Sequence, residues 1–196
     1  MILPICQAGD LVLRQPARPL TPREIVSPPI QKLISSMFET MRAAPGVGLA
    51  APQVGMPLQV AVIEDPQDAI DKLSPEAAAE RLRSGVEPHV LVNPRLTLEG
   101  PAEIEFFEGC LSLTGFTAIV PRALTVRVDC LNERAQPVTI RARGWYARIL
   151  QHEIDHLKGT LYIDRMAIRS FMGRENFDRY WKDKSVAECR RLLVDV

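Results

Sequence analysis

The stretch GWYARILQHEIDHL, residues 144–157, contains the pattern that decides the fold. A helix with apolar residues on every side, instead of along one stripe, is typical of a helix buried in a protein core. The apolar residues here are Trp145, Ile149, Leu150, Ile154 and Leu157. We therefore expect a buried helix at the centre of the domain, which ends at Gly159.

The same helix places two of the chain's 3 histidines four positions apart. Residues i and i+4 are neighbours on one helical face, so His152 and His156 can direct ring nitrogens at one metal ion. Glu153 lies beside the pair, where it can reach a water on the metal without being a ligand. The H-E-x-x-H pattern also arises by chance on exposed helices. In a buried helix, however, two imidazoles and a carboxylate need partners, and a metal supplies them.

A catalytic metal of this kind needs a third protein ligand. Cys110 is a stronger candidate than His89, the remaining histidine, because Gly109 permits close backbone approach and a thiolate binds iron, zinc or nickel. A lone buried cysteine can equally be a small core residue. A structural metal with four protein ligands would need His89 or Cys130, and a peptidase could use the same three ligands. The residues alone leave these alternatives open.

The surrounding sequence favours an α+β fold with antiparallel sheets, because the strand-like runs are joined by connections too short for crossover helices. These runs are residues 58–65, 89–99, 102–107 and 123–143, the last with a turn at 132–137. Apolar residues from Ile30 to Met41 recur at helical spacing, and Ser27 is the candidate N-cap.

A length of 196 residues predicts one catalytic domain, residues 1–196. The proline-rich first thirty residues are expected to be extended. Residues 65–88 are interpreted as a surface insertion with a short helix after Pro75. Residues 165–196 are predicted to be a variable C-terminal segment, irregular to about Lys184 and helical thereafter.

Composition excludes several classes of function. The 24 basic and 24 acidic side chains cancel, which removes the broad basic field that a non-specific nucleic-acid binder would use, and we expect no specific nucleic-acid binding. The 4 cysteines are too scattered for a disulfide scaffold, and no apolar run is long enough to span a membrane. We expect a cytoplasmic protein with no membrane association.

Three motifs in order resemble the peptide deformylase family: GVGLAAPQ (46–53), EGCLS (108–112) and QHEIDHL (151–157). The glycines of the first motif also fit a dinucleotide fingerprint, but that fingerprint follows a strand and opens a helix, and here a helix precedes it. The resemblance extends from residue 30 to about residue 164. It implies hydrolysis of the formyl group from the N-formylmethionine of new polypeptides.

The resemblance also implies roles for the residues that match the motifs. Cys110, His152 and His156 would bind one divalent metal, with water as the fourth ligand. Glu153 would act as general base and acid, and the Gln53 amide and the Leu111 N–H would stabilise the oxyanion. The matching substrate-binding positions are Val47, Gly48, Gly109, Phe106, Trp145 and Arg148, although for Arg148 solvent exposure is the ordinary alternative. Gly48 would let the peptide backbone pair with this segment as an added strand.

The family resemblance further implies Fe²⁺ as the metal in the cell, with Zn²⁺, Ni²⁺ or Co²⁺ possible after purification. The implied partners are N-formylmethionyl nascent peptides and, transiently, the ribosome. The chain is expected to be a monomer or a homodimer. One departure is Thr117, where many bacterial members carry a substrate-contacting arginine, although Arg122 lies nearby. The insertion resembles a branch found in organelles and some bacteria.

Overall fold

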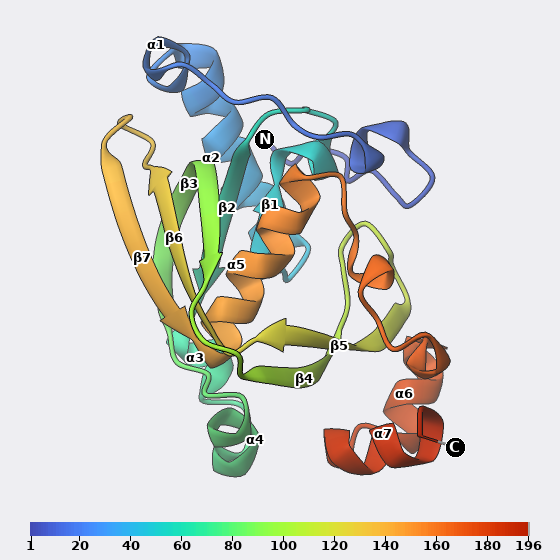
Figure 1. Ribbon diagram of the computed structural model, residues 1–196. Coiled ribbons are helices and arrows are strands. Elements are labelled where there is room, and N and C mark those ends of the chain that lie inside the picture. The colour runs from blue at the N-terminus through green and yellow to red at the C-terminus, as the bar shows by residue number, and fades with distance from the viewer. Residues whose placement is uncertain (196) are drawn as a thin grey trace.

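The computed structural model describes residues 1–195, which form two antiparallel sheets packed around one helix, α5 (Gly144–Leu157) (Figure 1). The first sheet has the order β1-β2-β3-β6-β7, with β1 (Gly48–Ala50), β2 (Val60–Asp65), β3 (Val86–Leu98), β6 (Thr125–Leu131) and β7 (Pro137–Arg143). The second has the order β4-β5-β8, with β4 (Glu103–Glu108), β5 (Phe116–Ala123) and β8 (Met172–Gly173). The predicted α+β class is confirmed.

The remaining helices lie around these sheets. They are α1 (Pro22–Ile25), α2 (Pro28–Ala43), α3 (Gln67–Ile70), α4 (Pro75–Glu80), α6 (Arg174–Tyr180) and α7 (Val186–Leu193), with short 3-10 helices at Leu11–Arg14, Ala51–Val54, Tyr162–Asp164 and Ile168–Ser170. No helix within residues 1–195 has both the length and the apolar character needed to cross a bilayer. Figure 1 shows α5 crossing one face of the five-stranded sheet, with β4 and β5 beside the end at which the helix begins.

Strand β2 is apolar on both faces because a helix covers each of them. Ala61 and Ile63 belong to the core that contains the apolar side chains of α5. Val60 and Val62 face the other way, into the core that contains the buried face of α2. Strand β6, farther from α2, instead alternates buried and partly exposed residues, as expected where only one face of a sheet is covered. The central position predicted for α5 follows from this arrangement.

Both ends of α5 are fixed by glycines with positive φ. Gly144 has φ 65°, and a Cβ there would lie 2.5 Å from the Cβ of Leu82. The insertion therefore packs directly against the first turn, where the Trp145 N–H donates to the carbonyl of Arg81 at 2.9 Å. At the other end Gly159 has φ 74°, and the helix stops as predicted.

Strand β5 was not predicted from the sequence, and it contains Pro121, a residue that strands tolerate only where its position needs no N–H donor. On the side of β5 away from β4, the Ile119 N–H donates to Ser170 Oγ at 2.8 Å instead of to another strand. Pro121 has the same alternation as Ile119, so its missing N–H lies on this side of β5, beyond the short pairing with β8, where a strand tolerates proline.

The two ends of the chain depart in part from prediction. The N-terminal arm is not wholly extended, because α1 forms there with a capping box between Thr21 and Glu24. The C-terminal helix after Ser185 was predicted and is present as α7, but the segment before Lys184 is not irregular throughout, since it contains β8 and α6.

Candidate metal centre

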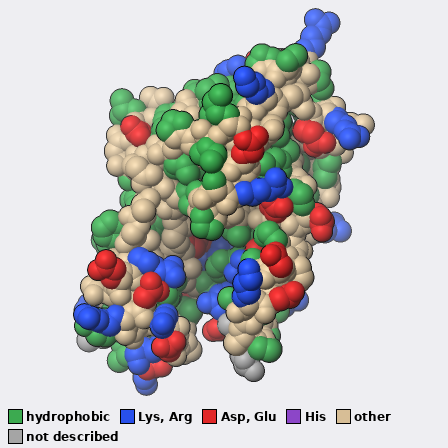
Figure 2. All heavy atoms as spheres, turned by 180° about the vertical axis from the view of Figure 1, so that it is seen from behind, with side chains coloured by type: hydrophobic (Ala, Val, Ile, Leu, Met, Phe, Trp, Pro, Cys, Tyr) green, Lys and Arg blue, Asp and Glu red, His purple; other side chains and the backbone are tan. Residues whose placement is uncertain are grey.

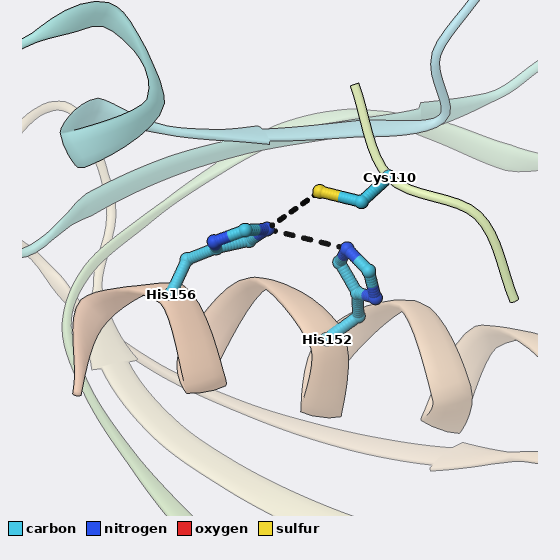
Figure 3. A group of neighbouring side chains, drawn as sticks. All are labelled: Cys110, His152 and His156. Atoms are coloured by element: carbon cyan, nitrogen blue, oxygen red, sulfur yellow. Dashed lines mark hydrogen bonds between the residues drawn. The ribbon is translucent and has the colours of Figure 1, made fainter. Parts of the chain in front are cut away.

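The sulfur and ring nitrogens of Cys110, His152 and His156 converge on one point, with all three potential ligand atoms within 4.8 Å of one another. The His156 Nε2 lies 3.3 Å from the Cys110 Sγ and 3.3 Å from the His152 Nε2 (Figure 3). Ligand atoms of a tetrahedral metal are about 3.5 Å apart when metal–ligand bonds have ordinary lengths. The nitrogen and sulfur donors therefore fit a single transition-metal ion.

Helix α5 and the loop after β4 supply these three residues. The two histidines occupy one face of α5 at i and i+4, so the buried helix fixes the spacing of their rings. Cys110 follows the last residue of β4 by two positions and reaches over the helix from the second sheet. The close approach of the two sheets around α5 thus brings together ligands that are more than forty residues apart in the sequence.

Glu108 orients the first histidine. Its Oε2 lies 3.0 Å from the His152 Nδ1, and since a carboxylate only accepts hydrogen bonds, Nδ1 donates and leaves Nε2 free to bind a metal. The carboxylate also accepts from Arg122, at 2.9 Å through two nitrogens, and from Arg148 at 2.6 Å. Burial by itself raises the pKa of Glu108, but the hydrogen bonds from His152 and Arg122 outweigh it and hold that pKa below its usual range.

The two histidines differ in their electrostatic surroundings. Burial holds the pKa of His156 well below its ordinary value, so the ring is neutral, as a metal ligand must be. Burial also acts to lower the pKa of His152, but Cys110 and Glu108 outweigh it and the pKa is raised well above the ordinary value. Negative groups that attract a proton to this point attract a metal cation for the same reason.

Glu153 is buried beside the two rings and faces β1. Its side chain is so close to Gly48 that a Cβ there would lie 2.3 Å from the Glu153 Oε1. Within the described part of the chain, the buried Oε2 atom has no hydrogen-bond partner. Burial raises the pKa of Glu153 to about 7. A carboxyl group with this pKa can both accept and donate a proton near neutral pH.

The amide of Gln53 points toward the same centre. Its Oε1 accepts from the Ala50 N–H at 2.8 Å, which turns Nε2 toward the Cys110 Sγ at 3.6 Å and the Ser112 Oγ at 3.2 Å. The alternative of a solvated loop glutamine is excluded, because the residue is only 2% exposed. Leu111 lies next to the sulfur, and its N–H donates to no acceptor among residues 1–195. Two N–H donors therefore lie near the converging ligand atoms.

A cavity of about 420 Å³ opens onto this centre. Figure 2 shows the molecule from behind, where the surface is hollowed between two charged lobes, which correspond to the C-terminal segment and the insertion. Of the predicted substrate-binding residues, those in the cavity wall are Val47, Gly48, Gly109, Trp145 and Arg148.

Phe106 is not part of the cavity wall, and its neighbour Phe107 is. Successive side chains of a strand face opposite sides, so only one of the two phenylalanines of β4 can reach the cavity. Phe106 is 2% exposed and packs edge-on against Trp145, with ring centroids 6.1 Å apart. Phe106 thus supports the Trp145 ring from behind, and its contact with substrate stays a prediction.

Arg148 is also buried, so the alternative of solvent exposure is wrong. Its guanidinium donates to the carbonyls of Val120 and Ile104 at 2.9 and 2.6 Å, in addition to Glu108. These three acceptors use the Nη1 and Nη2 atoms, so the charge is directed into the protein and not toward the cavity. Although Arg148 lies in the cavity wall, its guanidinium therefore serves mainly to hold the Glu108 carboxylate in place.

Neither alternative fourth ligand lies at the centre. The His89 Nε2 is 2.9 Å from the Tyr146 hydroxyl, and its Nδ1 is 2.7 Å from the Glu87 carbonyl. Cys130 is a buried member of the main core, 7% exposed. Among residues 1–195, the group of convergent ligand atoms consists of Cys110 and the two histidines of α5. Three ligands leave a position for water or substrate, as in catalytic metal sites.

The residues that support the ligands had no predicted role. Glu108 is part of the EGCLS motif, but its contacts come from β5 and α5 and are visible only in the folded chain. Asp155, inside HEIDH, forms ion pairs with Arg122 and Arg165. Ser112 holds the Gln53 amide at its hydroxyl. The sequence signal that could have suggested these roles is an acidic residue inside each ligand motif, Glu108 in EGCLS and Asp155 in HEIDH.

A mixed α+β fold that brings an H-E-x-x-H helix and a thiol together at an open cavity defines a mononuclear metallohydrolase type of site. A sequence model of the family described as polypeptide deformylase matches residues 2–171. The chain belongs to this family.

Curated relatives agree with this assignment. "Peptide deformylase 1A, chloroplastic" of Solanum lycopersicum is 47% identical over 174 residues, which are 89% of this chain and 63% of the relative. The chain thus spans less than two thirds of the length of that plant protein. "Peptide deformylase 1" of Streptomyces coelicolor is 45% identical over 91% of this chain and 80% of its own length.

Solved structures match as well. A class I type b peptide deformylase from Acinetobacter baumannii, crystallised with Met-Ala-Ser bound, has a TM-score of 0.75 at 31% identity, covering 85% of this chain and 99% of that one. A peptide deformylase from Ehrlichia chaffeensis has a TM-score of 0.72 at 31% identity, covering 91% and 92%.

Proposed function

We propose that the protein hydrolyses the formamide of N-formylmethionyl peptides, releasing formate and a free amino terminus. The observation that carries the proposal is the convergence of Cys110, His152 and His156 beside the cavity, whose wall includes Cys110, His152 and the buried Glu153. Family membership and the Met-Ala-Ser complex of the Acinetobacter baumannii relative support the same substrate class.

Cys110, His152 and His156 would hold the metal. When bound, a divalent ion at this site supplies a Lewis acid that lowers the pKa of water and polarises the formyl oxygen. A divalent ion bound by one thiolate and two neutral imidazoles would keep a net positive charge, which favours that polarisation. We propose Fe²⁺ as the metal in the cell, with Zn²⁺, Ni²⁺ or Co²⁺ as replacements, because nitrogen and sulfur donors accept all four.

Glu153 moves the proton. It takes a proton from the attacking water as the oxygen bonds to the formyl carbon, and it delivers a proton to the nitrogen as the C–N bond breaks. Its pKa of about 7 matches both directions of transfer. The carboxyl is held in place by its close packing against Gly48.

Gln53 and Leu111 stabilise the negative charge that develops on the formyl oxygen. The Gln53 Nε2 is already directed toward the centre by the Ala50 N–H, so little reorganisation is needed in the transition state. The Leu111 N–H is available at the same place. Loss of one such donor costs about 3 kcal/mol in the barrier of comparable reactions.

The substrate enters along β1 and the cavity. β1 is an edge strand of the five-stranded sheet, so its outer side can pair with a peptide backbone. Val47, Trp145 and Phe107 give the cavity an apolar wall for the methionine side chain, with Gly109 at the rim near the metal ligands. Phe106, which packs behind Trp145, supports this wall.

The decisive test is a formate assay on anaerobically purified protein whose metal content is measured, with formyl-Met-Ala as substrate. Glu153→Ala is expected to lower kcat about 10²–10⁴-fold with the metal retained, because only the proton carrier is removed. Glu87→Ala, which removes an exposed glutamate of β3, is the matched control. Full activity in Glu153→Ala would defeat the assignment of the base.

The same assay separates a peptidase from a deformylase. Unblocked Met-Ala-Ser and an internal peptide bond are offered beside the formylated peptide. Preferential cleavage of the unblocked peptide would favour a peptidase with the same ligands. A single domain over residues 1–196, transient ribosome association, a monomeric or homodimeric state and a cytoplasmic location stay predictions, and the relatives include both chloroplastic and bacterial proteins.

A further inference from the structure

The C-terminal segment contributes a charged residue, Arg174, to the wall of the catalytic cavity. The other charged residues in the wall, apart from the histidine, are Glu108, Arg148 and Glu153, each at most 5% exposed. The side chain of Arg174, by contrast, is 60% exposed. Arg174 is therefore the charged group that a peptide meets at the rim, outside the part of the cavity that surrounds the metal ligands.

The position of Arg174 is fixed by the fold. Its N–H donates to the Gly115 carbonyl at 2.8 Å, immediately after the pairing of β8 with β5. Phe177, one turn further along α6, packs on Phe107 with ring centroids 4.7 Å apart. Phe107 and Gly115 both belong to the cavity wall, so the segment is attached to the wall at two points.

The guanidinium is oriented but keeps donors available. Its Nε contacts the Asp178 carboxylate at 3.0 and 3.2 Å, and its Cζ lies 5.1 Å from the centre of the Phe177 ring. The terminal nitrogens Nη1 and Nη2 donate to no residue in the part of the chain that the structure describes. Because an arginine has most of its N–H groups on these two atoms, it can bind oxygen acceptors of a ligand without breaking its own ion pair.

The neighbouring polar residues of β5 cannot donate hydrogen bonds to a ligand in the cavity. Thr117 is 3% exposed, and its hydroxyl donates to the Glu108 carbonyl at 2.8 Å. Arg122 is also 3% exposed and is directed at Glu108 and Asp155 in the interior. On this side of the cavity the exposed cationic donor thus comes from α6 and not from the catalytic core.

We propose that Arg174 is a specificity-determining residue, whose guanidinium binds the carbonyl and carboxylate oxygens of the peptide beyond the formylmethionine. The inference rests on the proposed deformylase function and names the part of the substrate that the C-terminal segment recognises. The occupant is an extended peptide chain, since the rim continues from the cavity in which the formylmethionine is bound.

The test compares substrates of increasing length: N-formylmethionine amide, formyl-Met-Ala-Ser, and formyl-Met-Ala-Ser with an amidated C-terminus. The ratio of kcat/KM for the tripeptide to kcat/KM for N-formylmethionine amide is expected to be about fivefold smaller in Arg174→Ala than in wild type. This is the effect of losing one charge-assisted hydrogen bond at an exposed site. The change is expected in KM and not in kcat, because Arg174 does not contact the reacting atoms. Wild-type protein should also prefer the free carboxylate to the amide, and Arg174→Glu should reverse this preference.

Two further variants make the result specific. Arg179→Ala removes an arginine of the same helix that lies over Tyr180 and outside the cavity wall, and it should behave as wild type. Arg174→Lys keeps the charge at the start of α6 and should retain the preference for the carboxylate. If Arg174→Ala and Arg174→Glu keep the wild-type dependence on length and terminal charge, the inference is wrong. If wild-type protein releases formate from none of the substrates, the proposed function itself fails.

Discussion

The carboxylate of Glu108 shows how much of this site depends on a residue that is not a metal ligand. It receives hydrogen bonds from one ligand ring and from two buried arginines, and it is 5% exposed. The arginines keep Glu108 ionised, and the ionised carboxylate keeps the His152 ring in the tautomer that offers Nε2 to the metal. The orientation of His152 is thus set from three different elements, β4, β5 and α5.

Glu108→Gln is expected to lower metal affinity about 10–100-fold, because the outer partner of a ligating histidine is weakened. Competition with a chelator of known affinity, on protein shown by circular dichroism to be folded, measures the change. Glu105→Gln is the matched control on the same strand, since Glu105 pairs with Arg190 and does not contact a ligand. Equal affinity in the two variants would show that Glu108 does not orient the ring.

The metal ligands could be predicted at the residue scale, because their spacing on one helix and the EGCLS motif are local features. The choice between Phe106 and Phe107 could not. Both are apolar and adjacent in one strand, so the alternation of the strand says that they face opposite sides but not which side holds the cavity. In the folded chain Phe106 packs against Trp145, and Phe107 packs against Phe177 of α6.

At the scale of elements, the contact between β1 and α5 depends on the absence of a side chain at Gly48. This residue does not have the positive φ that would require glycine for backbone reasons. The requirement comes from the Glu153 side chain, whose Oε1, Cδ and Cγ would lie 2.3, 2.6 and 2.8 Å from an added Cβ. The strand and the helix are therefore close enough for the carboxyl to be enclosed between them.

Gly48→Ala is expected to reduce kcat more than tenfold, because Glu153 must move away from the position in which it transfers protons. Steady-state formate release gives the value, and a thermal melt shows whether the fold is retained. Gly173→Ala is the matched control, since a Cβ at Gly173 would meet nothing within 4 Å. Activity within twofold of wild type in Gly48→Ala would mean that Glu153 is not held by this contact.

The elements that could be predicted from sequence are those whose pattern is periodic over many residues. Helices α2 and α5 and strands β2, β3, β6 and β7 belong to this group, whereas β1, with three residues, was not predicted. Strand β5 was missed because its sequence, FTAIVPRA, does not alternate apolar and polar residues, and α6 because only seven residues, few of them apolar, form it. Both are stabilised by contacts with distant segments: β5 by Ser170, and α6 by Phe107.

At the scale of the whole molecule, a buried charge network connects the catalytic core to the C-terminal segment. Asp155 of α5 accepts from Arg122 of β5 and, at 2.6 and 2.7 Å, from Arg165, which begins the C-terminal segment. Through Arg122 the network continues to Glu108 and the metal centre. The segment that carries Arg174 is thus joined to the site by charge as well as by aromatic packing.

Asp155→Asn is expected to destabilise the protein by about 3–5 kcal/mol, because removing one member of a buried ion network leaves a buried arginine incompletely compensated. Asp155 is 4% exposed, so water cannot replace the lost charge. Denaturant unfolding of the metal-free protein measures the loss. Asp129→Asn should cost less than about 1 kcal/mol, because Asp129 pairs with Arg127 at the surface, where its side chain is 44% exposed.

The same variant tests whether the network connects the C-terminal segment to the core. Since Arg165 loses its bidentate partner in Asp155→Asn, amide hydrogens of residues 165–180 should exchange faster with solvent than in wild type, while those of β2 and β3 change less. Asp129→Asn should leave the exchange of residues 165–180 unaltered. If Asp155→Asn destabilises the protein but speeds exchange equally everywhere, Asp155 supports the core alone, and the attachment of the C-terminal segment then depends on the contacts of Phe177 with Phe107.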